Sequence, residues 1–158
     1  MESNCWPTLV CFVRMLRLEV LDRPGNRAQK EPFAFLVAAG VLDDSARARL
    51  AVDFPRYTSA GFFPHEPDDC GPSVNALIAE LTAPVFAHVV GMKLGIDSLE
   101  TFPTLVTICR MLNKRHGTIH TDSQSKIATA LLYLNETWPD TSAGCLRFLQ
   151  RADSIDDQ

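Results

Sequence analysis

The sequence predicts an α+β fold in which helices come first along the chain, strands follow, and the helices pack on one side of an antiparallel sheet. Helix signals mark three segments before Gly95. After Pro103 the pattern changes to runs rich in β-branched residues, each bounded by turn residues. With 158 residues, 46% of them hydrophobic and 22% charged, the chain is long and apolar enough to form one domain with its own core.

The first apolar run of the chain, residues 6–21, is interrupted by Arg14, Arg17 and Glu19. It is too short and too charged for a transmembrane helix, which needs about 20 apolar residues. It also lacks the basic start and the small-residue cleavage site of a secretory signal. We therefore expect an amphipathic helix or an edge strand here, no membrane partner, and a cytoplasmic protein.

A polar, turn-rich linker follows at residues 22–32. The expected domain organisation is therefore an N-terminal extension and linker in residues 1–31 and one compact domain in residues 32–158. The compact domain is expected to open with a strand at residues 32–42, which leads to a turn marked by Gly40.

A helix is predicted over residues 43–54. Asp43 or Asp44 is a suitable N-cap, because a short acidic side chain can accept a hydrogen bond from the first helical turn. Ala46, Leu50 and Phe54 then repeat at helical spacing.

Residues 55–72 are crowded with Pro, Gly and Asp and predict a long loop, with Phe62 and Phe63 as its anchors. Two further helices are predicted over residues 73–81 and 84–94. Pro84 suits the first helical position, and a stop follows at Gly95.

Four strands are predicted after Pro103. Each is a short run of β-branched or apolar residues between turn signals. They cover residues 104–112, 117–121, 126–135 and 144–149.

Charge and cysteine content exclude some function classes. The net charge of −4 is mild and argues against a nucleic-acid partner, since such proteins normally show a basic face. The cysteines are odd in number and form no C-x-x-C pair, so neither a zinc ribbon nor a dithiol redox motif is supported. Reduced thiols of a cytoplasmic protein are expected at Cys5, Cys11, Cys70, Cys109 and Cys145.

His120 and Asp122 lie in a predicted strand, with one residue between them. Side chains two residues apart on a strand share a face, with Cα atoms about 7 Å apart, so both can approach one cation. An imidazole and a carboxylate are two of the three ligands in the 2-His-1-carboxylate triad that holds non-haem Fe(II). The alternative is that Asp122 opens an Asx-turn into residues 123–125.

The surrounding residues carry a family resemblance. Residues 119–149 read IHTDSQSKIATALLYLNETWPDTSAGCLRFL. This segment resembles the iron-binding strand and following hairpin of the 2-oxoglutarate- and Fe(II)-dependent oxygenase superfamily, in particular its prolyl-hydroxylase-like branch. Residues 32–55 and the GFFP stretch at 61–64 are similar to the helical half of the same group.

The resemblance implies N-terminal helices packed on a partial double-stranded β-helix, or jelly roll. It implies that His120 and Asp122 are the first two ligands of Fe(II), with 2-oxoglutarate as co-substrate. Thr129 and Tyr133 lie on the next expected strand and are the candidates for co-substrate binding, although Tyr133 fits the core equally well. The implied activity is hydroxylation of a protein side chain or a small molecule.

Two features of the family pattern are missing from the sequence. No histidine follows His120 to act as the third ligand, and the family's co-substrate-binding Arg comes after that histidine. Of the upstream histidines, His116 lies about 13 Å from His120 on an extended strand. His88 belongs to a predicted helix, and His65 to an acidic loop that reads as a solvated turn.

Two functions are therefore open. The chain is expected to be an Fe(II)/2-oxoglutarate-dependent dioxygenase domain, or the N-terminal part of one, shortened before the third ligand. Alternatively it is a non-catalytic jelly-roll protein that acts as an interaction module. Because a half-barrel leaves strand edges unpaired, self-association through an open sheet edge is expected.

Overall fold

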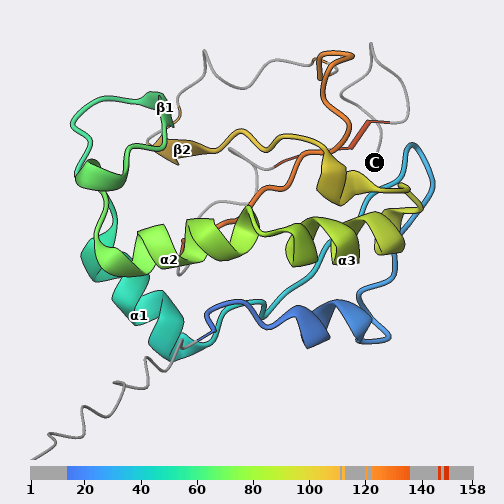
Figure 1. The fold of residues 1–158 in the computed structure, drawn as a ribbon, viewed down its shortest axis with the longest axis horizontal. Helices are drawn as coiled ribbons and strands as arrows, with labels where there is room; N and C mark the ends of the chain where they lie inside the picture. Colours follow the sequence, from blue (N-terminus) through green and yellow to red (C-terminus); the bar gives the residue numbers. More distant parts are fainter. Residues whose placement is uncertain are drawn as a thin grey trace, which may run out of the picture.

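The computed structural model describes residues 14–110, 112, 120, 122–135, 146, 148 and 149. Within this part the protein is an α+β structure, as predicted (Figure 1). Its helices are α1 (Asp44–Asp53), α2 (Pro72–Leu81) and α3 (Pro84–Leu94), and its antiparallel sheet consists of β1 (Gly61–Pro64) and β2 (Thr107–Arg110). Short 3₁₀-helices lie at Leu18–Asp22, Pro67–Asp69 and Leu99–Thr101.

Helix α1 begins at the predicted cap. The Asp43 carboxylate accepts a hydrogen bond from the Ala46 N–H at 2.7 Å, which satisfies one of the free donors of the first turn. Ala46 and Leu50 are buried on the face that meets the core. The helix ends where Phe54 turns extended, because the residue before a proline avoids helical backbone angles.

Asp53, the last residue of α1, holds the start of α2. Its backbone carbonyl accepts from the Gly71 N–H at 2.9 Å, and its carboxylate accepts from the Ser73 N–H at 2.8 Å. A Cβ at Gly71 would lie 2.5 Å from the Asp53 Cβ, so only glycine permits this approach. Hydrogen bonding by Ser73 holds the pKa of the Asp53 carboxyl below its ordinary value.

Helices α2 and α3 are separated by a break after Leu81, and α3 has the predicted bounds. Pro84 opens it, and Gly95 ends it in the left-handed conformation with φ 71°. In the described part of the chain, no single helix has the length and apolar character needed to cross a membrane. The α2–α3 pair reaches both only when taken together, with a bend of 49° between its halves.

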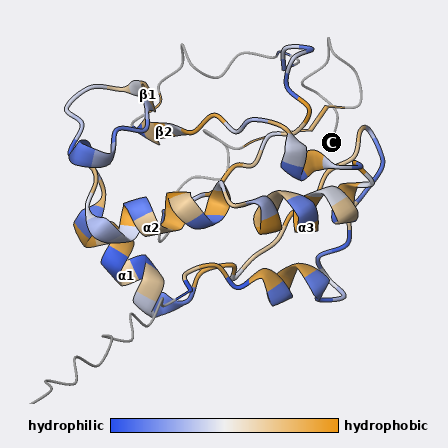
Figure 2. Ribbon diagram, viewed as in Figure 1, coloured by the Kyte–Doolittle hydropathy of each residue, from blue (hydrophilic) through white to orange (hydrophobic). Residues whose placement is uncertain are grey.

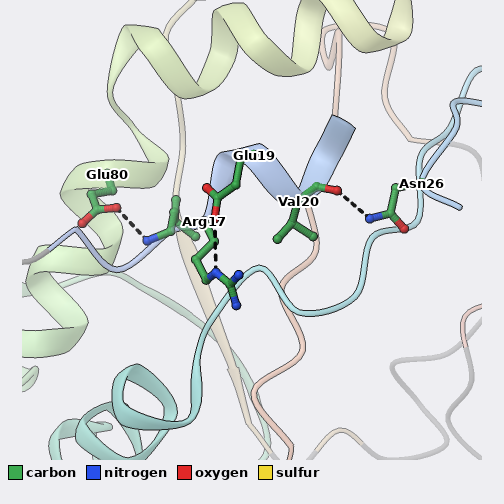
Figure 3. A network of polar contacts seen from close by, with 6 residues as sticks. Arg17, Glu19, Val20, Asn26 and Glu80 are labelled. Carbon is green, nitrogen blue, oxygen red and sulfur yellow. Dashed lines mark hydrogen bonds and ion pairs between the residues drawn. The ribbon is translucent and has the colours of Figure 1, made fainter. Parts of the chain in front are cut away.

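The segment before Asp22 packs against α2. The Glu80 carboxylate on α2 accepts hydrogen bonds from the backbone N–H groups of Met15 and Leu16, at 2.7 and 2.9 Å. Figure 3 shows Glu80 reaching this segment, and Asn26 donating to the Val20 carbonyl at 2.8 Å. Met15 and Leu16 are buried in the same core cluster as α1 and α2, so part of the expected extension belongs to the core.

Strand β1 lies inside the segment predicted as a loop, so that prediction is wrong at residues 61–64. It pairs with β2 in the register Gly61 to Arg110 and Phe63 to Ile108. The Phe63 ring stacks on Tyr57 with centroids 4.0 Å apart and anchors the segment as expected. Phe62, on the other face, is mostly exposed.

The strand predicted at residues 32–42 is absent. Only one isolated antiparallel bridge, between Gln29 and Phe35, lies in this region. The two residues exchange both backbone hydrogen bonds across a tight local turn. In the part of the chain that the structure describes, no second strand runs beside residues 36–42, and the one backbone bond to them from another segment is that of the Arg17 N–H to the Val41 carbonyl, so no ladder forms.

The strand predicted at residues 104–112 is present as the shorter β2, whereas residues 122–135 contain no strand. Burial nevertheless alternates at the end of this segment: Leu132 and Leu134 are half-buried against the core, and Leu131 and Tyr133 are exposed. The alternation is that of a strand, but among the described residues no neighbouring strand supplies hydrogen bonds there. Of the strands predicted at 117–121 and 144–149, the structure describes only residues 120, 146, 148 and 149, so these strands and the jelly roll stay predictions.

The core lies between α1, α2 and the N-terminal segment, and β2 reaches it through Ile108. Leu50 and Val20 are the largest fully buried side chains in the described part. The residues of the core cluster are Met15, Leu16, Leu42, Ala46, Leu50, Val74, Leu77, Ile78 and Ile108.

Candidate metal centre

The Asp122 carboxylate has a different partner on each oxygen. Oδ1 accepts a hydrogen bond from Lys126 Nζ at 2.9 Å, and Oδ2 accepts one from Thr129 Oγ1 at 2.7 Å. A backbone turn, in which the Lys126 N–H donates to the Ser123 carbonyl at 2.9 Å, brings Lys126 back beside Asp122. Local chain reversal therefore assembles this group from residues within one short segment.

These contacts favour the ionised form of Asp122. The hydrogen bond from Thr129 and then that from Lys126 hold the pKa of its carboxyl below the ordinary value, and the nearby His120 adds to the effect. The Lys126–Asp122 pair is an ion pair whose two side chains are both substantially exposed. At neutral pH the site thus presents an anionic carboxylate at the surface.

His120 is exposed and lies close enough to Asp122 to lower the pKa of that carboxyl. Residues 113–119 and 121, which would complete the expected strand around it, are outside the described part. The structure therefore brings the two predicted ligands near each other without describing the strand that was expected to align them.

The donor set fits two positions of a metal site. An imidazole nitrogen and a carboxylate oxygen are both ligands of Fe(II), and the hydrogen bond from Thr129 is of the kind that orients a ligating carboxylate. Within the residues that the structure describes, no three His, Cys, Asp or Glu side chains come together as a metal-binding group. Among the described residues there are thus two candidate ligands and no third.

The other described histidines have structural partners. His65 Nε2 lies 2.8 Å from Asn75 Oδ1, and His88 Nδ1 lies 3.4 Å from a Glu100 carboxylate oxygen. The acidic residues after His65 are exposed, as expected for a solvated turn. His116 lies outside the described residues.

The two candidate co-substrate residues, Thr129 and Tyr133, have different surroundings in the structure. Thr129 donates its hydroxyl hydrogen bond to Asp122, a contact that the sequence analysis did not predict. Tyr133 is 54% exposed, which places it outside the described core. Lys126 was also missed, although its spacing of four residues from Asp122 would have suggested an ion pair if a compact turn had been expected there.

Comparisons with known proteins find no family model that matches the chain, and no match among curated proteins or solved structures.

Proposed function

We propose that this chain carries the His-x-Asp part of an Fe(II)/2-oxoglutarate-dependent dioxygenase of the hydroxylase type. His120 would supply an imidazole nitrogen and Asp122 an anionic oxygen. The observation that carries the proposal is the Asp122 carboxylate, which is ionised, lies near His120 and is oriented through one oxygen by Thr129. The sequence resemblance of residues 119–149 supports the choice of iron.

The metal and co-substrate, when bound, would supply the oxidising chemistry with O₂ as the oxidant: one oxygen atom would enter succinate as 2-oxoglutarate loses CO₂, and the other would convert a substrate C–H bond to C–OH. The chain's own residues would bind the metal and orient its ligands. Asp122 contributes the charge that attracts the cation, and Thr129 keeps the carboxylate turned toward it. Tyr133, which lies on the same segment, is the proposed contact for 2-oxoglutarate, and the substrate is a protein side chain or a small molecule.

Metal titration under anaerobic conditions tests this proposal. Isothermal titration calorimetry with Fe(II) should show weak, one-to-one binding to the wild type, because only two protein ligands are proposed. Asp122→Asn and His120→Ala should each abolish the heat signal. His88→Ala is the matched control, since it removes an exposed histidine from α3 and should leave binding unchanged. Equal binding by wild type and Asp122→Asn would refute the proposed site.

A second candidate function is that of an interaction module, including self-association. Helix α3 is apolar on most sides, yet Gly91 is its one buried residue in the structure. Met92 is 73% exposed and Leu105, just before β2, is 85% exposed. Figure 2 shows hydrophobic colour along α3. In this second function, these exposed side chains would be the ones that pack against another surface.

Sedimentation velocity tests self-association directly. The wild type should sediment as a concentration-dependent mixture of monomer and larger species. Leu105→Asp should shift it to the monomer, while Val52→Asp, which changes an exposed valine on α1, should not. A wild type that stays monomeric at all concentrations would rule out self-association.

A further inference from the structure

We propose that Lys126 occupies the cation position of Asp122 in the metal-free protein and is displaced when a metal binds, while Thr129 keeps its hydrogen bond. This inference rests on the proposed function, and it concerns how that site is controlled. It makes Lys126 a built-in competitor of the metal and Thr129 a positioning residue.

The two oxygens of the Asp122 carboxylate accept hydrogen bonds from two different kinds of donor. Lys126 brings a full positive charge to Oδ1, at 2.9 Å, whereas Thr129 brings a neutral hydroxyl to Oδ2, at 2.7 Å. A metal ion that binds Oδ1 would face the ammonium directly, and two cations cannot share that position. The hydroxyl opposes no such ligand, so it can remain on Oδ2 after the metal has bound.

The Lys126–Asp122 pair is suited to exchange. Both side chains are partly exposed, and ion pairs in that setting are weak because water screens them. The lysine can leave by rotating its flexible side chain, without unfolding the turn that holds its backbone. The ammonium therefore lowers metal affinity without blocking the site completely.

Metal affinity measured on the full chain tests the displacement. Free Mn(II), counted by its EPR signal at fixed ionic strength, gives the affinity of each variant. Lys126→Met should bind Mn(II) severalfold more tightly than the wild type, because the competitor is gone. The matched control is Lys93→Met, which also removes one lysine from an ion pair, here with Asp22, and it should leave the affinity at the wild-type value.

Thr129 is tested in the same assay. Thr129→Val should bind Mn(II) more weakly than the wild type. Thr129→Ser should bind it like the wild type, because serine retains the hydroxyl donor. A loss that serine fails to restore would overturn the positioning role.

A metal-free measurement tests the ion pair by itself. In NMR spectra of the lysine ammonium groups, the Lys126 signal should exchange slowly with water in the wild type and rapidly in Asp122→Asn. The Lys93 signal should be the same in both proteins.

The outcomes distinguish this inference from the proposed function. If Asp122→Asn loses Mn(II) binding but Lys126→Met binds like the wild type, the competitor role is wrong and the metal site stands. If Lys126→Met and Lys93→Met tighten binding equally, the effect is one of net charge and the inference is overturned. If Asp122→Asn binds as well as the wild type, the proposed function fails and the inference fails with it.

Discussion

The burial of apolar side chains differs between residues 42–81 and residues 122–135. In the first region one face of each helix is buried, including Leu50 on α1 and Leu77 on α2. In the second region Leu132 and Leu134 are half-buried and every other described residue is exposed. A helix completes its backbone hydrogen bonds within itself and needs only a surface to pack on, whereas a strand also needs a partner along its length.

The same contrast holds for one aspartate in each region. Asp53 and Asp122 both have a pKa lowered by hydrogen bonds. Asp53 accepts from a backbone N–H at the start of α2, so its partner is fixed by the fold. Asp122 accepts from two side chains that can rotate away. The first carboxylate therefore stabilises the structure, whereas the partners of the second are mobile enough for the exchange with a metal that we propose.

The largest expected effect is in the buried region. Leu50→Ala removes a side chain that is 2% exposed, and should lower the free energy of unfolding by about 2–5 kcal/mol through lost burial and a new cavity. Val52→Ala, on the exposed side of the same helix, should change it by less than about 0.5 kcal/mol. Urea unfolding measures both, and equal losses would contradict the assigned core face of α1.

The junction of α1 and α2 should be the next most sensitive position. Gly71→Ala places a methyl group against Asp53 and should cost about 1–3 kcal/mol, since one of the two must move. Gly25→Ala is the control, because a Cβ there would meet nothing within 4 Å. If thermal unfolding gave both variants the wild-type midpoint, the close approach at Gly71 would be wrong.

The cap of α1 should contribute less. Asp43→Ala removes the acceptor for the Ala46 N–H and should lower the free energy of unfolding by about 1 kcal/mol. Asp44→Ala removes only a first-turn charge paired with Arg47, and should cost a few tenths of a kcal/mol, roughly. The reverse ranking in urea unfolding would assign the cap to Asp44.

Stability should also depend on pH through Asp53. Because its folded-state pKa is lowered, the ionised carboxylate stabilises the fold at pH above the unfolded value of about 3.9, and this contribution is lost as the pH falls through the folded pKa. Asp53→Asn should therefore be less stable than the wild type at pH 7, and the difference should shrink below about pH 4. Urea midpoints across this range check the result. A difference that is constant with pH would assign the effect of the substitution to something other than the charge.

The smallest effect is expected in the exposed segment. Lys126→Met breaks an exposed ion pair and should change the free energy of unfolding by less than about 1 kcal/mol. A loss as large as that of Leu50→Ala would mean that the pair supports the fold and is not free to exchange.

The sequence predicted the helices well because their signals are local. The Asp43 cap, Pro84 and Gly95 act within one turn, and the bounds of α1 and α2 differ from the predicted ones by one residue. Strand β1 was missed because its partner β2 is distant in sequence and its four residues include Gly61 and Pro64. The metal candidates His120 and Asp122 followed from their spacing and the resemblance, but the contacts of Lys126 and Thr129 depend on a turn that strand periodicity does not predict.

Paramagnetic broadening by Mn(II) in the NMR spectrum of the ¹⁵N-labelled chain tests the central claim most directly. The strongest broadening should appear around His120, Asp122 and their neighbours on the exposed segment, and it should disappear in Asp122→Asn. No comparable broadening is expected in the acidic turn at Pro67–Asp69. Strongest broadening at that turn, or an unchanged pattern in Asp122→Asn, would contradict the assignment of Asp122 as a metal ligand.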